Sequence, residues 1–214
     1  MNILVTAGPT REPLDPVRFL SNRSTGKMGY AIAASAAGRG HAVRLVSGPV
    51  SLASPDGVAV SRVGTAAQML AAVEDAFLWC DVLVMSAAVA DWKPKAVSGQ
   101  KLKKASMSAV LELEPTVDIL RTVAKKKTSQ LVVGFAAETE NVVAQAHQKR
   151  IAKGLDLVVA NDVSRTDAGF EVDTNAVTFV TGDGEALDLP LMSKVAVAEH
   201  LLDWIEKQRG QRPR

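Results

Sequence analysis

The chain begins with Met1-Asn-Ile-Leu-Val-Thr-Ala-Gly8, a short apolar run that ends at a glycine. This run lacks the basic start and the separate apolar segment of a signal peptide, and it is typical of a buried strand, here Asn2–Thr6, that leads into a tight turn. An alanine-rich segment of helical period follows at Gly26–Arg39. A strand followed by a helix is the repeating unit of parallel sheets, so this stretch predicts an α/β fold.

The same alternation continues along the chain and extends the prediction. Further strands are expected at Ala42–Ser47, Val58–Arg62, Asp81–Ser86, Leu131–Phe135 and Asp156–Ala160. Further helices are expected at Thr65–Leu78, Thr116–Lys127, Thr139–Lys153 and Ser193–Gln208, and the first and third of these have Thr65 and Thr139 as expected N-caps. Two last strands, Ala176–Thr181 and Glu185–Leu189, flank Gly182-Asp-Gly184, which signals a hairpin.

Length and composition fit one globular domain. The chain has 214 residues, of which 47% are hydrophobic and 22% charged, and chains of this size bury roughly 70% of their unfolded surface. The 25 basic and 23 acidic residues leave a net charge of +2, which is too small to predict a nucleic-acid or membrane partner. No stretch reaches the roughly 20 apolar residues that span a bilayer. We expect one domain over residues 1–206 and a loose C-terminal tail over 207–214.

The few cysteines and histidines exclude two kinds of site. Cys80 is the only cysteine, so it forms neither an intramolecular disulfide nor a cysteine-only metal site. The three histidines, His41, His147 and His200, are too scattered to form a metal-ligand motif. This cysteine usage favours a reducing, cytoplasmic location.

Two segments are longer than the connections in α/β units usually are. Residues 7–25 separate the first strand from the first helix, where roughly two to six residues are usual, and loops of that length are commonly functional. Residues 87–114 hold Pro94, Gly99 and a lysine cluster. We interpret residues 92–114 as an arm that pairs with another subunit.

Glycine-containing stretches at both ends of the first long loop favour an anion site. Ala7-Gly-Pro-Thr10 follows the first strand, and Ser21-Asn-Arg-Ser-Thr-Gly-Lys-Met-Gly29 opens the first helix. Glycines let backbone amides approach a phosphate, and a helix N-terminus adds about half a positive charge. A Walker A loop is excluded, because Ser21 and Met28 stand where that motif needs a glycine and a hydroxyl residue. The alternative is a turn that only packs the helix on the strand.

Further small or polar groups follow later strands or belong to the arm. They are Ser86-Ala-Ala-Val-Ala-Asp91, Lys101-Leu-Lys-Lys104, Gly134-Phe-Ala-Ala-Glu-Thr139 and Asn161-Asp162, together with Lys149 and Lys153 on one helix face. Because the carboxyl ends of parallel strands meet at one edge of a sheet, we expect most of these groups to converge there.

Each of these groups also has a plain structural interpretation. Asp91 could accept hydrogen bonds from a sugar or an amide or help hold a metal, or it could cap a turn. The lysines around Lys101 could contact a ligand or form a solvated strand edge. Phe135 could stack on a base or lie in the core, and the two helix lysines could make surface pairs. Asn161 could read a base edge or form an Asx-turn.

In combination, six motifs resemble bacterial phosphopantothenoylcysteine synthetase, the CTP-dependent phosphopantothenate–cysteine ligase. They occur in the order and spacing of that family between Met1 and Trp204: Val5-Thr-Ala-Gly-Pro-Thr-Arg-Glu-Pro-Leu-Asp-Pro-Val-Arg18, Ser21-Asn-Arg-Ser-Thr-Gly-Lys-Met-Gly29, Ala87-Ala-Val-Ala-Asp91, Lys101-Leu-Lys-Lys104, Gly134-Phe-Ala-Ala-Glu-Thr139 and Asn161-Asp-Val-Ser164. The resemblance implies a Rossmann-like, doubly wound, mainly parallel sheet with helices on both faces and an extended dimerisation arm. One departure is Val117-Asp-Ile119, where the family has Pro-Asp-Ile.

The resemblance also implies a reaction. Members of this family join 4′-phosphopantothenate to L-cysteine in coenzyme A biosynthesis. CTP first gives an acyl-cytidylate and pyrophosphate, with Mg²⁺ as the expected cofactor, and cysteine then displaces CMP. Members act as homodimers, and we place the interface at the arm. In most bacteria a flavin-dependent decarboxylase precedes this domain on the same chain. This sequence holds only the synthetase motifs, so we expect a stand-alone synthetase or an excised domain, with a separate decarboxylase as partner.

Positions that match the family motifs give the expected site residues. The nucleotide is expected to lie against Gly8, Ser24, Gly26, Gly29, Asp91, Lys101, Phe135, Lys149, Lys153 and Asn161. The phosphopantothenoyl substrate is expected to bind at Asn22, Ala87 and Ala88. Catalytic roles are implied for Asn22, for Lys101 in the activation step and for Arg18 in the second half-reaction.

Two other functions stay open as alternatives. An NAD(P) oxidoreductase of similar fold is disfavoured, because the only tyrosine, Tyr30, is followed at the required spacing by Ala34 instead of lysine, and because the chain has no Gly-x-Gly-x-x-Gly motif. A non-catalytic nucleotide sensor would need neither Asn22 nor Lys101.

Overall fold

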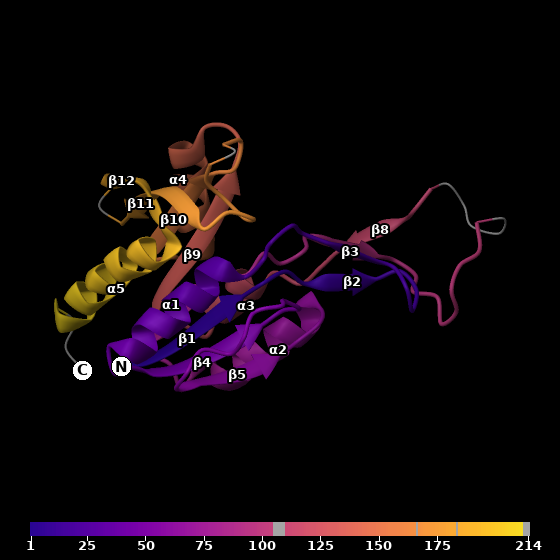
Figure 1. The fold of residues 1–214 in the computed structure, drawn as a ribbon, viewed down its shortest axis with the longest axis horizontal. Coiled ribbons are helices and arrows are strands. Elements are labelled where there is room, and N and C mark those ends of the chain that lie inside the picture. Colours follow the sequence, from indigo (N-terminus) through magenta and orange to yellow (C-terminus); the bar gives the residue numbers. More distant parts are fainter. Residues whose placement is uncertain (105–109, 166, 183, 212–214) are drawn as a thin grey trace.

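An eight-stranded sheet in the order β12-β11-β10-β9-β6-β1-β4-β5 forms the centre of the fold (Figure 1). Six of its strands run parallel: β1 (Asn2–Ala7), β4 (Ala42–Ser47), β5 (Val58–Arg62), β6 (Val82–Met85), β9 (Leu131–Glu138) and β10 (Leu157–Asp162). The antiparallel hairpin of β11 (Thr174–Thr181) and β12 (Ala186–Ser193) extends the sheet beyond β10. This computed structural model describes residues 1–104, 110–165, 167–182 and 184–211, so Asp183 of the predicted hairpin turn lies outside the described residues.

The strand order is that of a doubly wound sheet. The chain builds outward from β1 through β4 to β5, and then returns to the other side of β1 with β6, β9 and β10. The order therefore reverses between β1 and β6, and open α/β sheets bind ligands outside the carboxyl ends of the strands at such a point. The predicted Rossmann-like, mainly parallel sheet is confirmed.

Helices cover both faces of the sheet. α1 (Lys27–Gly38) and α5 (Lys194–Gln211) pack on one face, and α2 (Ala66–Phe77), α3 (Ile119–Ala124) and α4 (Val142–Lys153) pack on the other. Alternate residues of each strand point to opposite faces, so Ile3 and Val5 join the core beneath α1 and α5, while Leu4 joins the other core. Both faces of the central strands are buried, which explains their continuous apolar runs. In the described part of the chain, no helix combines the length and hydrophobicity that a membrane crossing requires.

The helix starts show where local sequence signals succeed and fail. Thr65 caps α2 through a reciprocal pair of hydrogen bonds with Gln68, as expected. The predicted cap Thr139 is wrong, because β9 continues to Glu138 and Asn141 precedes α4 with a positive φ of 49°. The predicted start of α3 at Thr116 is also wrong. Thr116 donates its backbone N–H to the Asp91 carbonyl at 2.9 Å, next to the β7–β8 pair, and α3 begins only at Ile119.

The C-terminal end of α5 corrects the predicted tail. We expected residues 207–214 to be loose, but the helix continues to Gln211. Lysine, glutamine and arginine are good helix formers, and Arg209 donates to the Asp81 carboxylate at 3.1 Å and to the Ser129 carbonyl at 3.0 Å. Residues 212–214 of the predicted tail lie outside the described residues.

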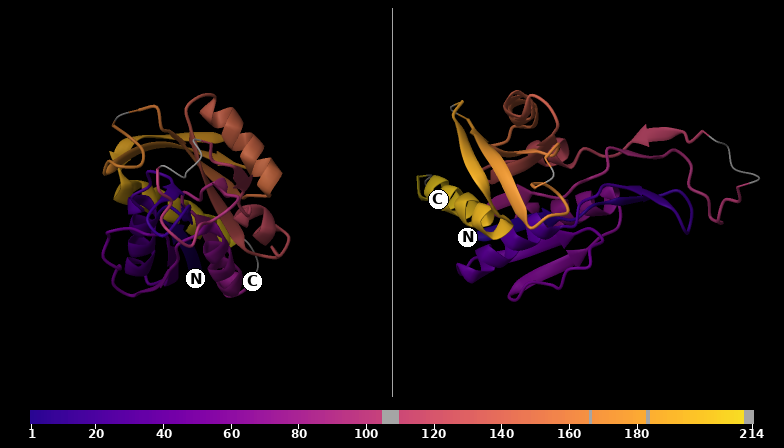
Figure 2. Two further views of the ribbon diagram at one scale, coloured as in Figure 1. Left: turned by 90° about the vertical axis from the view of Figure 1, so that its right-hand side faces the viewer. Right: turned by 45° about the horizontal axis from the view of Figure 1, so that its top comes forward.

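A long arm projects from one end of the body (Figures 1 and 2). It consists of two short antiparallel pairs with their connecting loops: β2 (Arg11–Pro13) with β3 (Phe19–Ser21), and β7 (Trp92–Pro94) with β8 (Leu113–Pro115). Residues 105–109 of the predicted arm are not among those the structure describes. The arm joins the body where the Thr10 N–H donates to the Ala88 carbonyl at 3.3 Å and the buried Glu12 carboxylate accepts from the Ala66 N–H at 2.8 Å. Both long loops singled out in the sequence therefore lead into one projection.

Candidate active site

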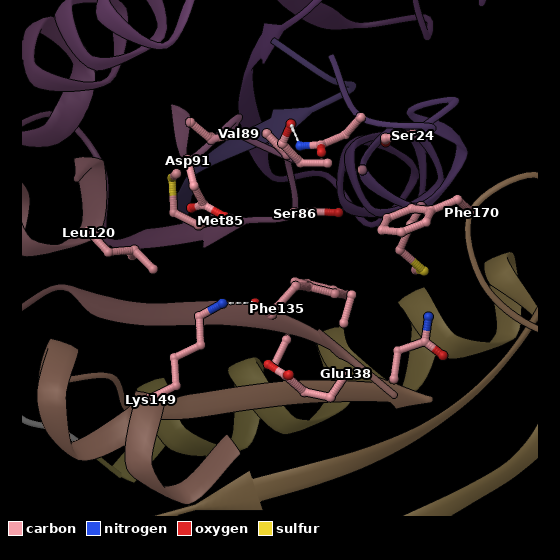
Figure 3. Close-up of a pocket in the computed structure, with 18 of the residues that line it drawn as sticks. Ser24, Met85, Ser86, Val89, Asp91, Leu120, Phe135, Glu138, Lys149 and Phe170 are labelled. Atoms are coloured by element: carbon pink, nitrogen blue, oxygen red, sulfur yellow. Dashed lines mark hydrogen bonds between the residues drawn. The ribbon is translucent and has the colours of Figure 1, made fainter. Parts of the chain in front are cut away.

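A cavity of about 1010 Å³ lies at the carboxyl edge of the sheet. Figure 3 shows two walls facing each other: Ser24 and the Met85–Asp91 segment on one side, and Phe135, Glu138 and Lys149 on the other. The first wall comes from the end of β6, the segment that follows it and the start of α1, and the second comes from β9, α4 and β10. The cavity therefore lies at the switch point of the sheet, where the convergence of polar groups was predicted.

Glycines bring the start of α1 close to β1. Gly26, with φ of 79°, precedes the helix in a left-handed conformation that glycine tolerates best. A Cβ on Gly29 would lie 2.5 Å from the Ala7 Cβ and 2.9 Å from the Thr6 carbonyl oxygen, so only glycine fits there. Gly8 lies directly behind, because a Cβ on Gly26 would be 3.4 Å from the Gly8 Cα. These glycines pack the helix on the strand and also aim its N-terminal amides at the cavity.

Two buried threonines hold the segment that follows β6. The Thr6 hydroxyl accepts from the Ala87 N–H at 3.1 Å, and the Thr10 hydroxyl accepts from the Ala90 N–H at 2.9 Å. The Ala88 carbonyl then accepts from the Asn22 side-chain amide at 2.9 Å. Asn22 is exposed, but this bond fixes the direction of its amide at the mouth of the cavity.

The wall formed by β9 and α4 carries two lysines in different surroundings. Lys149 donates from Nζ to the Phe135 carbonyl at 2.6 Å, and burial lowers its pKa, against the opposing effect of the nearby Glu138 and Asp91 carboxylates. Lys153 instead pairs with the Asp118 carboxylate.

Asp118 connects the cavity to the start of α3. Its carboxylate accepts from the Arg121 N–H at 2.9 Å and so caps the helix. Burial raises the pKa of this carboxyl, but the hydrogen bonds from Lys153 and Arg121 outweigh burial and leave the pKa below its usual value. Lys153 therefore makes a side-chain ion pair, with Asp118, and both residues line the cavity.

An unpaired acceptor lies in the floor of the cavity. Asn161 is 7% exposed, and its Oδ1 has no hydrogen-bond partner. The Asx-turn expected as the alternative forms at the next residue, where Asp162 accepts from the Ser164 N–H at 2.9 Å. A buried acceptor without a partner costs free energy unless a ligand supplies a donor. Phe135 lines the same cavity and is only partly buried.

Among the lining residues that sequence reasoning missed are Phe170 and Lys194. Lys194 is 5% exposed and donates to the carbonyls of Phe170 and Val172, and the Phe170 carbonyl also accepts from the Thr25 hydroxyl at 2.9 Å. Burial lowers the pKa of Lys194 to about 8. No motif marks these residues, because the β11–β12 hairpin alone brings the start of α5 back to the loop that carries Phe170.

Most of the predicted site residues line this one cavity. Those that do are Asn22, Ser24, Gly26, Gly29, Ala87, Ala88, Asp91, Phe135, Lys149, Lys153 and Asn161. Gly8 lies behind the lining, while Arg18 and Lys101 lie on the arm and do not line the cavity of this chain. The roles of all these residues stay predictions.

The sequence of the chain places it among known proteins. Residues 1–208 match the family described as "DNA/pantothenate metabolism flavoprotein C-terminal domain". The chain is 49% identical over 215 residues to the "Coenzyme A biosynthesis bifunctional protein CoaBC" of Bacillus subtilis (strain 168), covering 99% of this chain and 53% of that protein. The protein of the same name from Escherichia coli (strain K12) is 47% identical over 218 residues, with 100% and 53% covered. The chain thus spans about half the length of these curated relatives.

Solved structures show the same fold. The crystal structure of the C-terminal domain of CoaBC superposes with a TM-score of 0.85 at 44% identity, covering 99% of this chain and 96% of that chain. A Cab2 mutant in complex with phosphopantothenate-cysteine gives a TM-score of 0.79 at 16% identity, covering 96% and 86%. At 16% identity, the similarity to Cab2 shows only a shared fold.

Proposed function

The chain belongs to the family of DNA/pantothenate metabolism flavoprotein C-terminal domains, and from that premise we propose that it is a phosphopantothenate–cysteine ligase. It joins 4′-phosphopantothenate to L-cysteine through an acyl-cytidylate, with CTP converted to CMP and pyrophosphate. The observation that carries this proposal is the cavity at the switch point, which brings Asn22, the start of α1, Lys149 and the unpaired Asn161 oxygen together. The two relatives named for coenzyme A biosynthesis, 49% and 47% identical to this chain, support the choice of substrates.

The first half-reaction activates the substrate carboxylate. One of its oxygens attacks the α-phosphorus of CTP, and the bond from that phosphorus to the pyrophosphate oxygen breaks. Negative charge gathers on the phosphoryl oxygens, so cations and backbone amides are the groups that lower the barrier. The N-terminus of α1 and Lys149 supply such groups in the cavity, and Lys101 would supply another from the arm.

The second half-reaction forms the amide. The cysteine nitrogen attacks the acyl carbonyl carbon, the amine gives up a proton, and the carbon–oxygen bond to CMP breaks. Asn22, oriented by the Ala88 carbonyl, keeps a second N–H that can donate to the carbonyl oxygen as it becomes negative.

The polar groups that line the cavity could bind a nucleotide together with Mg²⁺. The unpaired Asn161 Oδ1 would accept from the exocyclic amino group of cytosine, and Phe135 offers an aromatic face beside it. The described residues hold no group of three metal-ligating side chains. Mg²⁺ is commonly bound by one or two carboxylates together with substrate phosphates, and the carboxylate of Asp91, which faces the cavity in Figure 3, would hold it in that way. The ion would neutralise developing phosphate charge.

The arm is the part of the proposal that involves a second copy. Trp92, Val97 and Leu113 are 52%, 58% and 43% exposed, and apolar side chains gathered on a projection favour association. Arg18 and Lys101 lie on this arm and not in the cavity. We therefore propose a homodimer in which the arm of one copy approaches the cavity of the other. A decarboxylase on a separate chain, acting on the product, stays a prediction.

Mass spectrometry tests the reaction and its order. The protein is incubated with Mg²⁺, CTP and 4′-phosphopantothenate, first without cysteine and then with it, and ATP replaces CTP in parallel. We expect an acyl-cytidylate that becomes phosphopantothenoylcysteine and CMP when cysteine is added. A folded protein that binds a nucleotide but turns over neither would contradict the ligase and favour the nucleotide sensor.

A further inference from the structure

Asp15 is a buried carboxylate in an otherwise exposed part of the molecule. It lies in the loop between β2 and β3 on the arm, yet the residue is 3% exposed and its side chain is fully buried. Burying a charge costs free energy unless the charge is paired and fully hydrogen bonded. The partners of Asp15 therefore indicate what its carboxylate is for.

Its first partner is Arg18. Oδ1 of Asp15 accepts the backbone N–H groups of Val17 and Arg18, both at 2.8 Å. Oδ2 accepts from Nε and Nη2 of Arg18 at 3.0 and 2.6 Å. Two bonds to a planar guanidinium fix its orientation as well as its position. The hydrogen bond from Arg18 is the main cause that holds the pKa of the Asp15 carboxyl well below its usual range, so the pair stays charged near neutral pH.

Its second partner is the lysine segment, Lys101–Lys104, in the loop between β7 and β8. The Leu102 N–H donates to Oδ2 of Asp15 at 3.1 Å, and Nη2 of Arg18 donates to the Leu102 carbonyl at 2.8 Å. The backbone N–H and carbonyl of Leu102 are therefore both held by the Asp15–Arg18 ion pair. The Ser98 N–H donates to the Leu14 carbonyl at 3.0 Å and adds a second tie between the two loops. Lys101 directly precedes the residue that is held.

We propose that Asp15 is a positioning residue that holds Arg18 and the Lys101 segment in one fixed arrangement on the arm. The inference rests on the proposed function, because it concerns two arm residues expected to act in different half-reactions. Asp15 itself touches no reacting atom in this account. Asp15 orders the guanidinium and the lysine segment in advance. The arm therefore loses less conformational entropy when it binds at a cavity.

The test separates the two half-reactions in the full chain. The variants are D15N, R18A and the double variant, with D203N as a matched control that removes the 2.8 Å ion pair of Asp203 with Arg39, at the end of α1 opposite the cavity. Acyl-cytidylate formation is measured without cysteine, and CMP release is measured after cysteine is added. We expect D15N to slow both steps by roughly tenfold to a hundredfold, as loss of charge-assisted hydrogen bonds does. D203N should match the wild type.

Coupling to Arg18 distinguishes positioning from general stability. If Asp15 acts through Arg18, adding D15N to R18A should slow the cysteine step by no more than about twofold further. Full additivity of the two changes, or wild-type rates in D15N, would overturn the proposal.

Hydrogen exchange tests the arm contact without turnover. The Leu102 amide should exchange faster in D15N than in the wild type and the D203N control, because its acceptor is weakened. Unchanged exchange in D15N would overturn the proposal even in an active enzyme. Absence of wild-type turnover together with faster exchange in D15N would instead overturn the proposed function and leave the arm contact established.

Discussion

The cavity and the arm are held together by different kinds of contact. The cavity is built on strands whose side chains are wholly buried on both faces, such as Ile3, Leu83 and Val133, so its walls are set by the core. The arm has two pairs of three-residue strands and leaves Trp92 and Val97 more than half exposed. One chain can therefore complete the cavity but cannot cover its own arm, and the proposed site needs both.

This difference predicts two classes of variant. Changes in the walls of the cavity should affect folding, chemistry or both, because wall and core share residues. Changes at exposed positions of the arm should affect chemistry or association and leave the free energy of unfolding nearly unchanged, since surface substitutions usually stay within about 0.5 kcal/mol.

The largest effect is expected from N22D. The substitution removes the amide that donates to the Ala88 carbonyl and puts a carboxylate oxygen against that carbonyl. Loss of one donor to a developing oxyanion costs about 3 kcal/mol of barrier, roughly a hundredfold in rate. We expect acyl-cytidylate to accumulate while CMP release stalls, as followed by mass spectrometry. If N22D still released CMP at the wild-type rate, Asn22 would have no role in the second half-reaction.

K101A tests the arm in the same assay. Lys101 is exposed and lies outside the cavity of its own chain. We expect pyrophosphate release to slow by roughly tenfold to a hundredfold, as for removal of one group that stabilises transition-state charge, while urea unfolding stays as in the wild type. A normal rate of pyrophosphate release would show that the arm lysine takes no part in activation.

Strand positions could be predicted from the sequence because a buried parallel strand is a continuous apolar run, whatever surrounds it. Ala42–Ser47 and Val58–Arg62 match the structure at both ends. Helix starts depend on caps, and Asn141 begins α4 from a left-handed conformation that asparagine adopts more readily than threonine.

The site could be predicted only where chemistry follows a strand. Phe135 and Asn161 lie in the second halves of β9 and β10, and Asp91 lies in the segment that follows β6, so the sheet brings them together. Lys194 was missed because a hairpin returns it to the cavity, and no residue spacing encodes that return. Asp15 was missed because its partner Leu102 lies in the loop between β7 and β8, 87 residues further along the chain.

The next largest expected effect is a difference in the free energy of unfolding between two glycine variants. G29A would place a Cβ 2.5 Å from the Ala7 Cβ in the body, while G99A on the arm would meet nothing within 4 Å. Overpacking of this kind costs about 1 to 3 kcal/mol. We expect urea unfolding to show that loss for G29A and almost none for G99A. Equal effects would contradict the division between a packed body and an open arm.

The smallest effect concerns pH. Burial lowers the pKa of Lys194 to about 8 from its ordinary value of 10.5, so between these values the unfolded chain binds more protons than the folded one. The unfolding free energy of the wild type relative to K194M should therefore rise from pH 8 toward pH 10. Urea unfolding at several pH values measures this difference. K194R, which stays charged, should show no such rise, and a flat wild-type curve would contradict the assignment.

Subunit complementation tests most directly that cavity and arm of different copies make one site. N22D carries a defective cavity and an intact arm, and K101A carries the reverse. Random mixing of the two chains leaves about half the dimers mixed, each with one intact site, so about a quarter of wild-type turnover should return. R18A mixed with K101A is the matched control, because both lesions lie on the arm. Mixed dimers no more active than the parent variants would contradict the account.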